Sequence, residues 1–334
     1  MEDFVVPNKN GWNLSMRRIR PDGEPAGRPA LLIPGYGMNS FIFGFHPTGP
    51  SLMEHLAARG IDTFTIDLRG MGKSERIGGN PSYGLAELCI ADVGAGIQAV
   101  LDKTGADKVD LIGCSLGAAL AFGHLACVPD AKVGSVVSLA GVVTWKRVHP
   151  LVRAAFYSKE LAGRIPIKNT RTAARVLLPV LARIAPGLLS IYLNPRSTNL
   201  SRVAEMVQTV EDPVPQINRE ISEWITRRDL LIRDVNVSTA LARMTYPYLC
   251  VVAEGDGVVP KETARAMYDE IGSLTKELCM VGGPGDPIAH GDLFLCKDAQ
   301  TRVYEPVADF LLRAHAESTP AGTAEHVDDG AAVA

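Results

Sequence analysis

A serine lies between two glycines in the stretch Gly113-Cys114-Ser115-Leu116-Gly117, where its hydroxyl could act as a nucleophile. A mainly apolar run, 109–112, precedes this stretch, and an alanine-rich run, 118–126, follows it. Strand, sharp turn and helix form a nucleophile elbow, in which the serine stands exposed above the carboxyl end of the strand. Because helix and strand approach closely there, glycine suits both flanking positions. The sequence therefore predicts Ser115 as a nucleophile.

An acid and a histidine follow this serine in chain order. Asp256 lies in the segment 254–260, directly after a predicted strand, so it should project from the same edge of a sheet as Ser115. An aspartate there can orient an imidazole and stabilise its charged form. Glu254, two residues earlier, is the alternative acid.

His290 is the preferred base among the seven histidines of the chain. It ends the loop 282–289, which follows the next predicted strand and precedes the last predicted helix. The other histidines lie before the serine, in the helix behind it, at the start of an insertion or in the tail: His46, His55, His124, His149, His315 and His326. Chain position thus favours Ser115, Asp256 and His290 as one catalytic group.

Length and composition fit one large α/β domain with an insertion. The chain has 334 residues, 46% of them hydrophobic, and a formal net charge of -3, which argues against nucleic-acid binding. Its six cysteines are scattered without the spacing of a zinc site, so we expect buried, reduced thiols in a cytoplasmic protein. The first residues show no secretory signal.

Strands and helices alternate along most of the chain, which predicts a parallel sheet with helices on both faces. An opening hairpin spans 3–20. Further strands are expected at 30–33, 61–67, 109–112, 133–139, 248–253 and 277–281, and helices at 51–59, 85–103, 118–126, 261–271 and 299–314.

The alternation stops between about Thr144 and Tyr248, and proline-broken helical sequence fills the gap. We therefore predict a core at 1–143 and 247–315, a helical cap at 144–246 and a disordered tail at 316–334. From Lys146 to Arg202 the cap has eleven Lys or Arg and one acid, Glu160. Either a cap helix packs its apolar face on the core and leaves a basic face in solvent, or this surface meets a lipid interface or an anionic substrate.

Taken together, these motifs resemble the α/β-hydrolase fold family over residues 1 to about 315. The resemblance rests on the serine elbow, on the order of Ser115, Asp256 and His290, and on three further segments: Pro34-Gly35-Tyr36-Gly37, Asp67-x-Arg69-Gly70-x-Gly72-x-Ser74 and Gly255-Asp256-x-x-Val259-Pro260. It implies a mostly parallel central sheet with helices on both faces and an inserted helical cap. The Asp67 to Ser74 motif is interpreted as a structural turn.

The segment 290–294 is similar to the carboxyl end of polyhydroxyalkanoate synthases and acid-lipase-like hydrolases. The synthases have a cysteine as nucleophile, whereas this chain has Ser115, and we interpret Cys114 as a small buried residue. The family resemblance further implies an oxyanion hole formed by the backbone N–H groups of Tyr36 and Leu116. It implies no metal and no organic cofactor.

The expected function is that of a serine hydrolase that cleaves a carboxylic ester or thioester through an acyl-enzyme on Ser115. The large, apolar, basic cap favours a medium or long acyl chain as the small-molecule substrate. An acyltransferase or a carbon–carbon bond hydrolase with the same triad remains an alternative, as does a non-catalytic ligand-binding member of the fold. Peripheral lipid contact through the basic cap and homo-oligomer formation are also left open.

Overall fold

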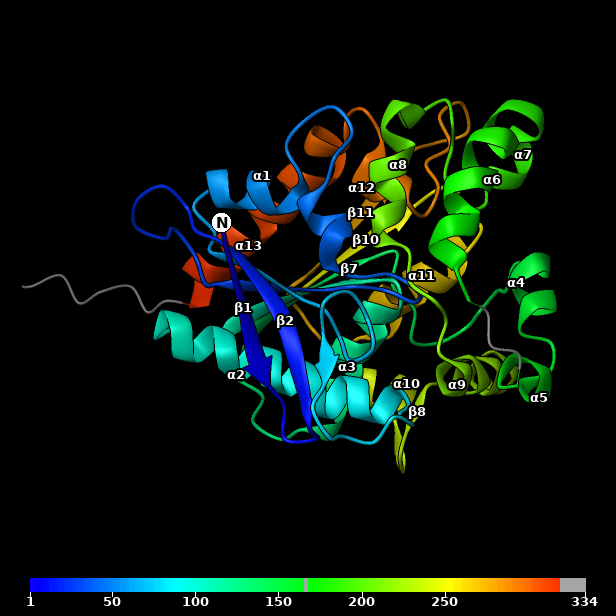
Figure 1. Ribbon diagram of the computed structural model, residues 1–334. Coiled ribbons are helices and arrows are strands. Elements are labelled where there is room, and N and C mark those ends of the chain that lie inside the picture. The colour runs from blue at the N-terminus through cyan, green and yellow to red at the C-terminus, as the bar shows by residue number, and fades with distance from the viewer. Residues whose placement is uncertain (165–167, 319–334) are drawn as a thin grey trace, which may run out of the picture.

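The central sheet has nine strands, and the computed structural model that contains it describes residues 1–164 and 168–318 (Figure 1). The strands are β1 (Glu2–Pro7), β2 (Trp12–Ile19), β3 (Ala30–Ile33), β4 (Thr63–Ile66), β5 (Glu75–Arg76), β6 (Val109–Cys114), β7 (Val133–Leu139), β10 (Tyr248–Ala253) and β11 (Lys276–Val281). Their order is β1-β2-β4-β3-β6-β7-β10-β11, with β5 paired to β2. The pairs of β2 with β1, β4 and β5 are antiparallel, and all others are parallel. The predicted mostly parallel sheet is confirmed.

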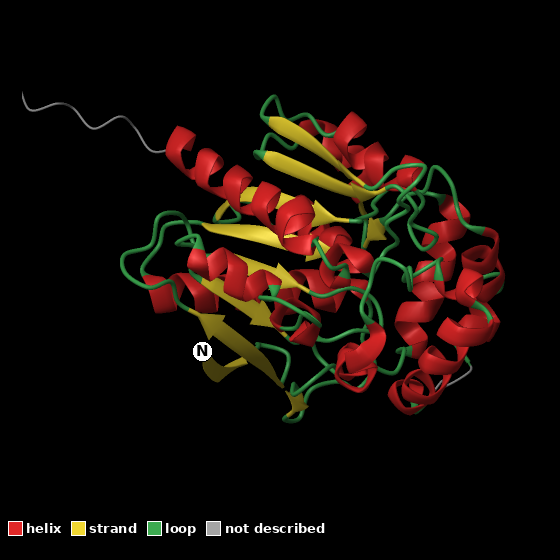
Figure 2. Ribbon diagram, turned by 90° about the horizontal axis from the view of Figure 1, so that it is seen from above, coloured by secondary structure: helices red, strands yellow, loops and turns green. Residues whose placement is uncertain are grey.

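Helices cover both faces of the sheet, as predicted (Figures 1 and 2). One face carries α2 (Val93–Thr104), α3 (Leu116–Cys127) and α11 (Lys261–Glu270), and the other carries α1 (Leu52–Ala58), α12 (Asp292–Leu295) and α13 (Glu305–Ser318). Short 3₁₀ turns at Ser40–Gly44 and Leu241–Arg243 complete the core.

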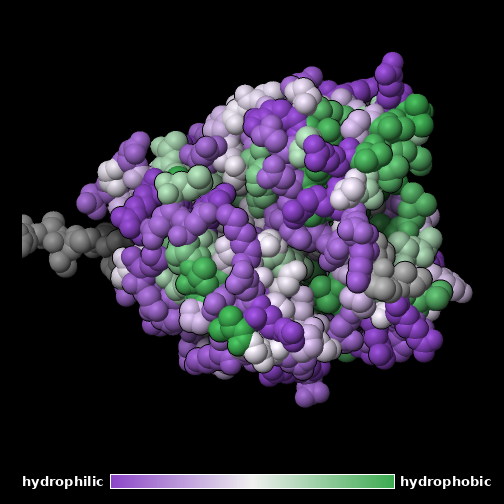
Figure 3. Space-filling model, viewed as in Figure 1, coloured by the Kyte–Doolittle hydropathy of each residue, from purple (hydrophilic) through white to green (hydrophobic). Residues whose placement is uncertain are grey.

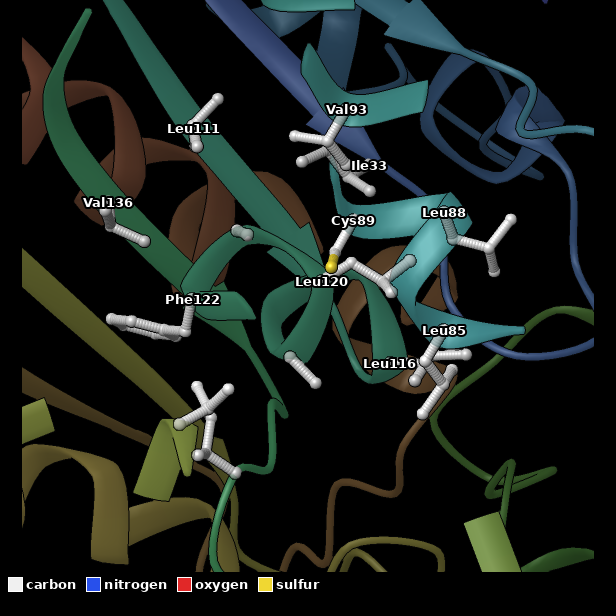
Figure 4. Packing of buried hydrophobic residues seen from close by; sticks show 14 of the residues in the cluster. Ile33, Leu85, Leu88, Cys89, Val93, Leu111, Leu116, Leu120, Phe122 and Val136 are labelled. Carbon is white, nitrogen blue, oxygen red and sulfur yellow. The ribbon is translucent and has the colours of Figure 1, made fainter. Parts of the chain in front are cut away.

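Side chains of the buried strands alternate between two apolar cores, because successive residues of a strand point to opposite faces. In β3, Leu31 and Ile33 belong to one core, while Ala30 and Leu32 belong to the other. Figure 4 shows the first core, in which strand residues such as Leu111 and Ile33 gather around α3. The two cores fix the sheet, and with it the strand ends that carry the predicted site.

Two predicted helices begin as π-helical turns, Glu87–Asp92 before α2 and Gln300–Tyr304 before α13. Helix α13 also runs to Ser318, so residues 316–318 are helical and are not part of a disordered tail as predicted. Burial of Ala314 and a hydrogen bond from the Arg28 guanidinium to the Ser318 hydroxyl hold this last turn. The rest of the predicted tail, 319–334, lies outside the described residues.

The insertion 144–246 is mostly helical and gathers at one side of the sheet (Figure 2). Its helices are α4 (Pro150–Ala155), α5 (Lys159–Ala162), α6 (Thr170–Ile184), α7 (Pro186–Leu189), α8 (Val203–Met206), α9 (Pro215–Arg227) and α10 (Val237–Ala240), with 3₁₀ turns at Leu200–Arg202 and Val207–Thr209. In the described residues, no helix is both long and apolar enough to cross a membrane.

The insertion also contains a small antiparallel hairpin that the sequence did not predict, β8 (Leu231–Ile232) with β9 (Val235–Asn236). Ile232 and Val237 belong to the same core as α3, so this part of the insertion packs with the sheet layer. Helix α9 is the other anchor of the insertion, because Trp224 is buried and donates its indole N–H to the Val143 carbonyl at 2.8 Å. The division into core and cap stays a prediction.

Candidate active site

Ser115 lies at a sharp turn between β6 and α3. Its φ of +53° and ψ of -117° are outside the regions that L-residues normally adopt, which is the strained conformation expected of a nucleophile elbow. A β-carbon at residue 113 would lie 2.4 Å from the Ala118 backbone, and one at residue 117 would lie 2.1 Å from the Ile33 carbonyl oxygen. Glycine is therefore required at both positions, for the steric reason that the sequence suggested.

Asp256 and His290 form a buried hydrogen-bonded pair. His290 Nδ1 lies 2.6 Å from Asp256 Oδ2, and the two side chains are 3% and 0% exposed. The other carboxylate oxygen accepts the backbone N–H groups of Val258 and Val259, at 2.7 and 2.9 Å. Since the carboxylate only accepts, Nδ1 carries the proton and the lone pair of Nε2 is left for a substrate or a hydroxyl group.

The rival acid and the other described histidines are engaged elsewhere. Glu254 forms an ion pair with Lys261. His46 contacts the Cys296 carbonyl, His124 contacts the Cys89 carbonyl, His55 contacts Glu305 and His149 contacts the N–H of Leu151. His315, predicted in the tail, lies on α13 instead. His326 lies outside the described residues. The geometry thus favours Asp256 and His290 over the alternatives considered from the sequence.

Ser115 stands at the same edge of the sheet as this pair. The elbow follows β6, and Asp256 follows β10, two strands away in the parallel part of the sheet. Within the part of the chain that the structure describes, no hydrogen bond joins the Ser115 hydroxyl to His290. Both residues are almost enclosed, at 7% and 2% exposure. The structure therefore brings Asp256 and His290 into contact and places Ser115 nearby without completing the triad.

Cys114 does not resemble a second nucleophile. It is 1% exposed, and burial, helped by the negative charge of Asp256, raises the pKa of its thiol well above the usual range. A thiol that stays protonated is a poor nucleophile. All six cysteines are free, and Cys89, Cys250 and Cys296 are buried as well.

The loop after β3 lies against the serine. A β-carbon on Gly35 would lie 3.0 Å from Ser115 Cβ. The side chain of Tyr36 turns into the cap, where its hydroxyl donates to Asn218 and its ring meets the edge of Phe156 at 5.9 Å. Among the described contacts, neither the backbone N–H of Tyr36 nor that of Leu116 has an acceptor. Both groups are free for the predicted oxyanion hole, which stays a prediction.

The Asp67 to Ser74 motif forms a turn that supports this loop. Asp67 accepts the backbone N–H groups of Ser40, at 2.8 Å, and of Lys73, at 2.9 Å. Arg69, 2% exposed, pairs with the fully buried Asp92 at 2.7 Å. These contacts are internal to the fold, which agrees with the structural role expected of the motif.

Two cap residues, Ile191 and Tyr192, form hydrogen bonds with both loops of the candidate site. We call this dipeptide the strap. The Ile191 carbonyl accepts the N–H of Gly257 at 3.0 Å, and the Tyr192 carbonyl accepts the N–H of Gly291 at 2.6 Å. The Tyr192 ring also packs on His290, with the ring centroids 5.9 Å apart. The acid loop, by which we mean residues 254–260 around Asp256, and the base loop, residues 282–291 with His290, therefore share one support from the cap.

Asp292 is a second buried support beside His290. Its carboxylate accepts the backbone N–H of Ala289 at 2.8 Å, the Thr198 hydroxyl at 2.7 Å and the backbone N–H of Asn194 at 3.0 Å. Burial raises its pKa to about 6, and these hydrogen bonds oppose the shift. Asp292 thus joins the histidine loop to the cap segment that follows the strap.

The sequence analysis did not single out the strap or Asp292 as part of the site. Asp292 carried a usable signal, an acid two residues after the predicted base at the start of an apolar run. The strap carried none, because it acts mainly through backbone carbonyls. In the described residues, no group of three or more His, Cys, Asp and Glu side chains lies close enough together to hold a metal ion.

Comparison with known proteins agrees with this architecture. A protein of Escherichia coli, the uncharacterized 31.7 kDa protein in the traX-finO intergenic region, is 25% identical over 69% of this chain and 74% of its own length. An esterase from Exiguobacterium antarcticum superposes with a TM-score of 0.61 at 16% identity, covering 93% of this chain and 99% of its own. An esterase from Rhodococcus sp. gives 0.63 at 18% identity, with 93% and 98% covered.

A monoacylglycerol lipase from Paleococcus ferrophilus superposes with a TM-score of 0.57 at 21% identity, covering 90% of this chain and 99% of its own. At these identities the structural likenesses concern the fold. The sequence model of the alpha/beta hydrolase fold matches residues 29–290, a span that includes the serine elbow, Asp256 and His290. Fold, topology and sequence thus agree that this chain belongs to the α/β-hydrolase family.

Proposed function

We propose that this protein is a serine hydrolase that cleaves carboxylic esters or thioesters. The observation that carries the proposal is the buried Asp256–His290 hydrogen bond of 2.6 Å at the sheet edge where Ser115 adopts a strained elbow conformation. The esterases and the lipase that share the fold support the same class of reaction. No cofactor is needed for this chemistry.

In the proposed reaction, Ser115 Oγ attacks the acyl carbonyl while His290 Nε2 takes its proton. Asp256 keeps the proton of His290 on Nδ1 and stabilises the imidazolium that forms. The N–H groups of Tyr36 and Leu116 stabilise the negative oxygen, each by about 3 kcal/mol. His290 then gives its proton to the leaving group, and a water molecule activated by the same nitrogen releases the acid from Ser115.

We further propose an acyl chain of medium or long length. The cap contributes two apolar side chains near the site: Phe156 lies against Tyr36, and Ile191 lies against Gly257. Apolar side chains in this position favour contact with hydrocarbon over contact with a small polar acyl group. The preferred length is measured by turnover of p-nitrophenyl esters from two to sixteen carbons.

Labelling with a fluorophosphonate, which reacts with an activated serine, tests the nucleophile. The comparison uses wild-type protein, Ser115→Ala and the matched neighbour variant Cys114→Ala. We expect labelling and ester turnover in the wild type and in Cys114→Ala, and a loss of turnover of roughly 10³-fold or more in Ser115→Ala. Loss of labelling in Cys114→Ala alone would contradict Ser115 as the nucleophile.

Product analysis separates the alternatives with the same triad. With an added alcohol or amine acceptor, an acyltransferase forms the transferred ester or amide, whereas a hydrolase releases mainly the free acid. A folded wild-type protein that binds esters but neither turns them over nor reacts with the fluorophosphonate would favour a ligand-binding role.

A further inference from the structure

The cap presents an apolar face to solvent. Five large side chains of α6 and α7 are roughly half exposed or more: Val176 (63%), Leu177 (53%), Val180 (48%), Ile184 (73%) and Leu188 (59%). We call these five residues the cap face, and Figure 3 shows them as a hydrophobic area over α6 and α7. The expectation that a cap helix packs its apolar face on the core is therefore wrong for this part of α6.

The cap face is not the packing side of its helix. Leu178, on the other side of α6, contacts the second core, whereas the residues of the cap face belong to neither core. Val176, Val180 and Ile184 are four residues apart and lie in one row along the helix. Isolated exposed apolar residues are ordinary, whereas a contiguous exposed row is typical of a surface that binds a protein or a membrane.

Basic residues border the cap face. Arg175 and Arg183, eight residues apart on α6, are exposed, and neither forms an ion pair within the described residues. No acid occurs in the sequence between Glu160 and Glu205, whereas this span includes seven Lys or Arg: Arg164, Lys168, Arg171, Arg175, Arg183, Arg196 and Arg202. Of these, Arg171 and Arg202 pair with acids outside the span.

The positive charge beside the cap face distinguishes two binding partners for it, a second copy of this chain and an anionic lipid bilayer. A second copy of this chain, docked face to face, would bring the arginines of one α6 against those of the other, and like charges at close range oppose association. The surface of an anionic bilayer offers the opposite charge together with an apolar interior. An amphipathic helix with a basic border binds such a surface while lying in its plane.

We propose that α6 and α7 dock this protein on the surface of an anionic lipid bilayer, with the cap face in the acyl region and Arg175 and Arg183 among the headgroups. The strap follows α7 directly, so docking places the candidate site next to the membrane. The proposal does not depend on the hydrolase reaction, and vesicle binding is measured without any substrate.

Co-flotation of the full chain with vesicles tests the proposal. Vesicles of phosphatidylcholine with one third phosphatidylglycerol are compared with vesicles of phosphatidylcholine alone. We expect binding to the anionic vesicles, weaker binding to the neutral ones, and a decrease as salt screens the arginines. The double variant R175Q/R183Q should bind the anionic vesicles about fivefold more weakly for each arginine removed.

Matched variants distinguish vesicle binding through the cap face from nonspecific binding through any exposed apolar side chain. L177S/I184S should lose at least about tenfold in binding, since both side chains are exposed and leave the fold unchanged. Leu274 is 101% exposed but lies just before β11, at the sheet edge opposite to the one that carries the candidate site, so L274S should bind like the wild type. Equal binding of wild type and L177S/I184S, or no wild-type binding at low salt, would overturn the proposal. So would a dimer in sedimentation that L177S/I184S converts to a monomer.

Discussion

The candidate site and the outer helices of the cap, α4 to α7, differ in burial and in hydrogen bonding. Asp256, His290 and Asp292 are buried and hydrogen-bonded on several sides, whereas α4, α5, α6 and α7 contain no buried residue among those described. Loops that carry catalytic groups need fixed geometry, and a surface that meets other molecules needs exposure. The molecule therefore combines a buried, hydrogen-bonded candidate site with a group of outer helices that have no buried side chain among the described residues.

The two regions meet at the strap. Ile191 and Tyr192 follow the exposed helix α7, yet their carbonyls bond the acid loop and the base loop. A β-carbon at residue 257 would lie 2.7 Å from the Ile191 side chain, so the fit is close at this contact. The strap is thus the place where a change in the outer cap can reach the site.

The largest effect is expected within the acid loop, where the buried Asp256 and the partly exposed Glu254 lie two residues apart. In Asp256→Asn the amide can donate to His290, which favours the wrong tautomer of the imidazole, so we expect kcat to fall by roughly 10⁴-fold. Glu254→Gln, which removes only the exposed ion pair with Lys261, should change kcat little. Ester turnover of the two folded variants makes the comparison. A comparable loss in Glu254→Gln would mean that the acid has been misassigned.

The next largest effect is expected on the free energy of unfolding, when a buried leucine of the core and an exposed leucine of the cap are each replaced by alanine. Leu120 of α3 is 1% exposed, and Leu177 of α6 is 53% exposed. We expect Leu120→Ala to lower the free energy of unfolding by about 2–5 kcal/mol, because it leaves a cavity. Leu177→Ala should change it by less than about 0.5 kcal/mol. Denaturation in urea measures both, and a large loss in Leu177→Ala would show that the cap face is packed against something in solution.

Local sterics explain which parts could be predicted from sequence. The elbow requires glycine on both sides of Ser115, and Asp256 and His290 lie on the loops that follow two successive strands, β10 and β11. The strap could not be predicted, because its carbonyls bond Gly257 and Gly291, which come much later in the chain, through backbone atoms that every residue has. The β8–β9 hairpin lacks a glycine turn: Arg233 takes a φ of +53° instead.

The cap shows a different limit of sequence analysis. The spacing of apolar residues in α6 reveals that the helix has two faces, but not which of them meets the core. Here α6 packs through Leu178, while the row from Val176 to Ile184 stays exposed. Only the position of the neighbouring elements decides between the two faces.

The smallest effect concerns Asp292 and depends on pH. Its pKa of about 6 in the folded protein lies above the ordinary value of 3.8, so the folded state binds the proton more tightly than the unfolded state. This group therefore stabilises the fold most below about pH 4, and its contribution is lost as pH rises through about 6. Neighbouring hydrogen-bond donors keep the carboxyl group in place in either form.

Replacing the carboxyl group of Asp292 with an amide tests how much the buried hydrogen bonds of the candidate site contribute to stability, in contrast to the exposed side chains of the cap. Asp292→Asn removes one acceptor oxygen, so one of its three donors loses its partner, and we expect a loss of about 1–3 kcal/mol near pH 4. The difference from wild type should shrink toward pH 7, where ionisation penalises the wild type alone. Asp269→Asn, at a 52% exposed side chain on α11, is the matched control and should show no such trend. Urea denaturation from pH 4 to 7 measures both variants. A difference that grows with pH would mean that the hydrogen bonds of Asp292 outweigh its burial, and that the carboxylate is the form that holds His290 to the cap.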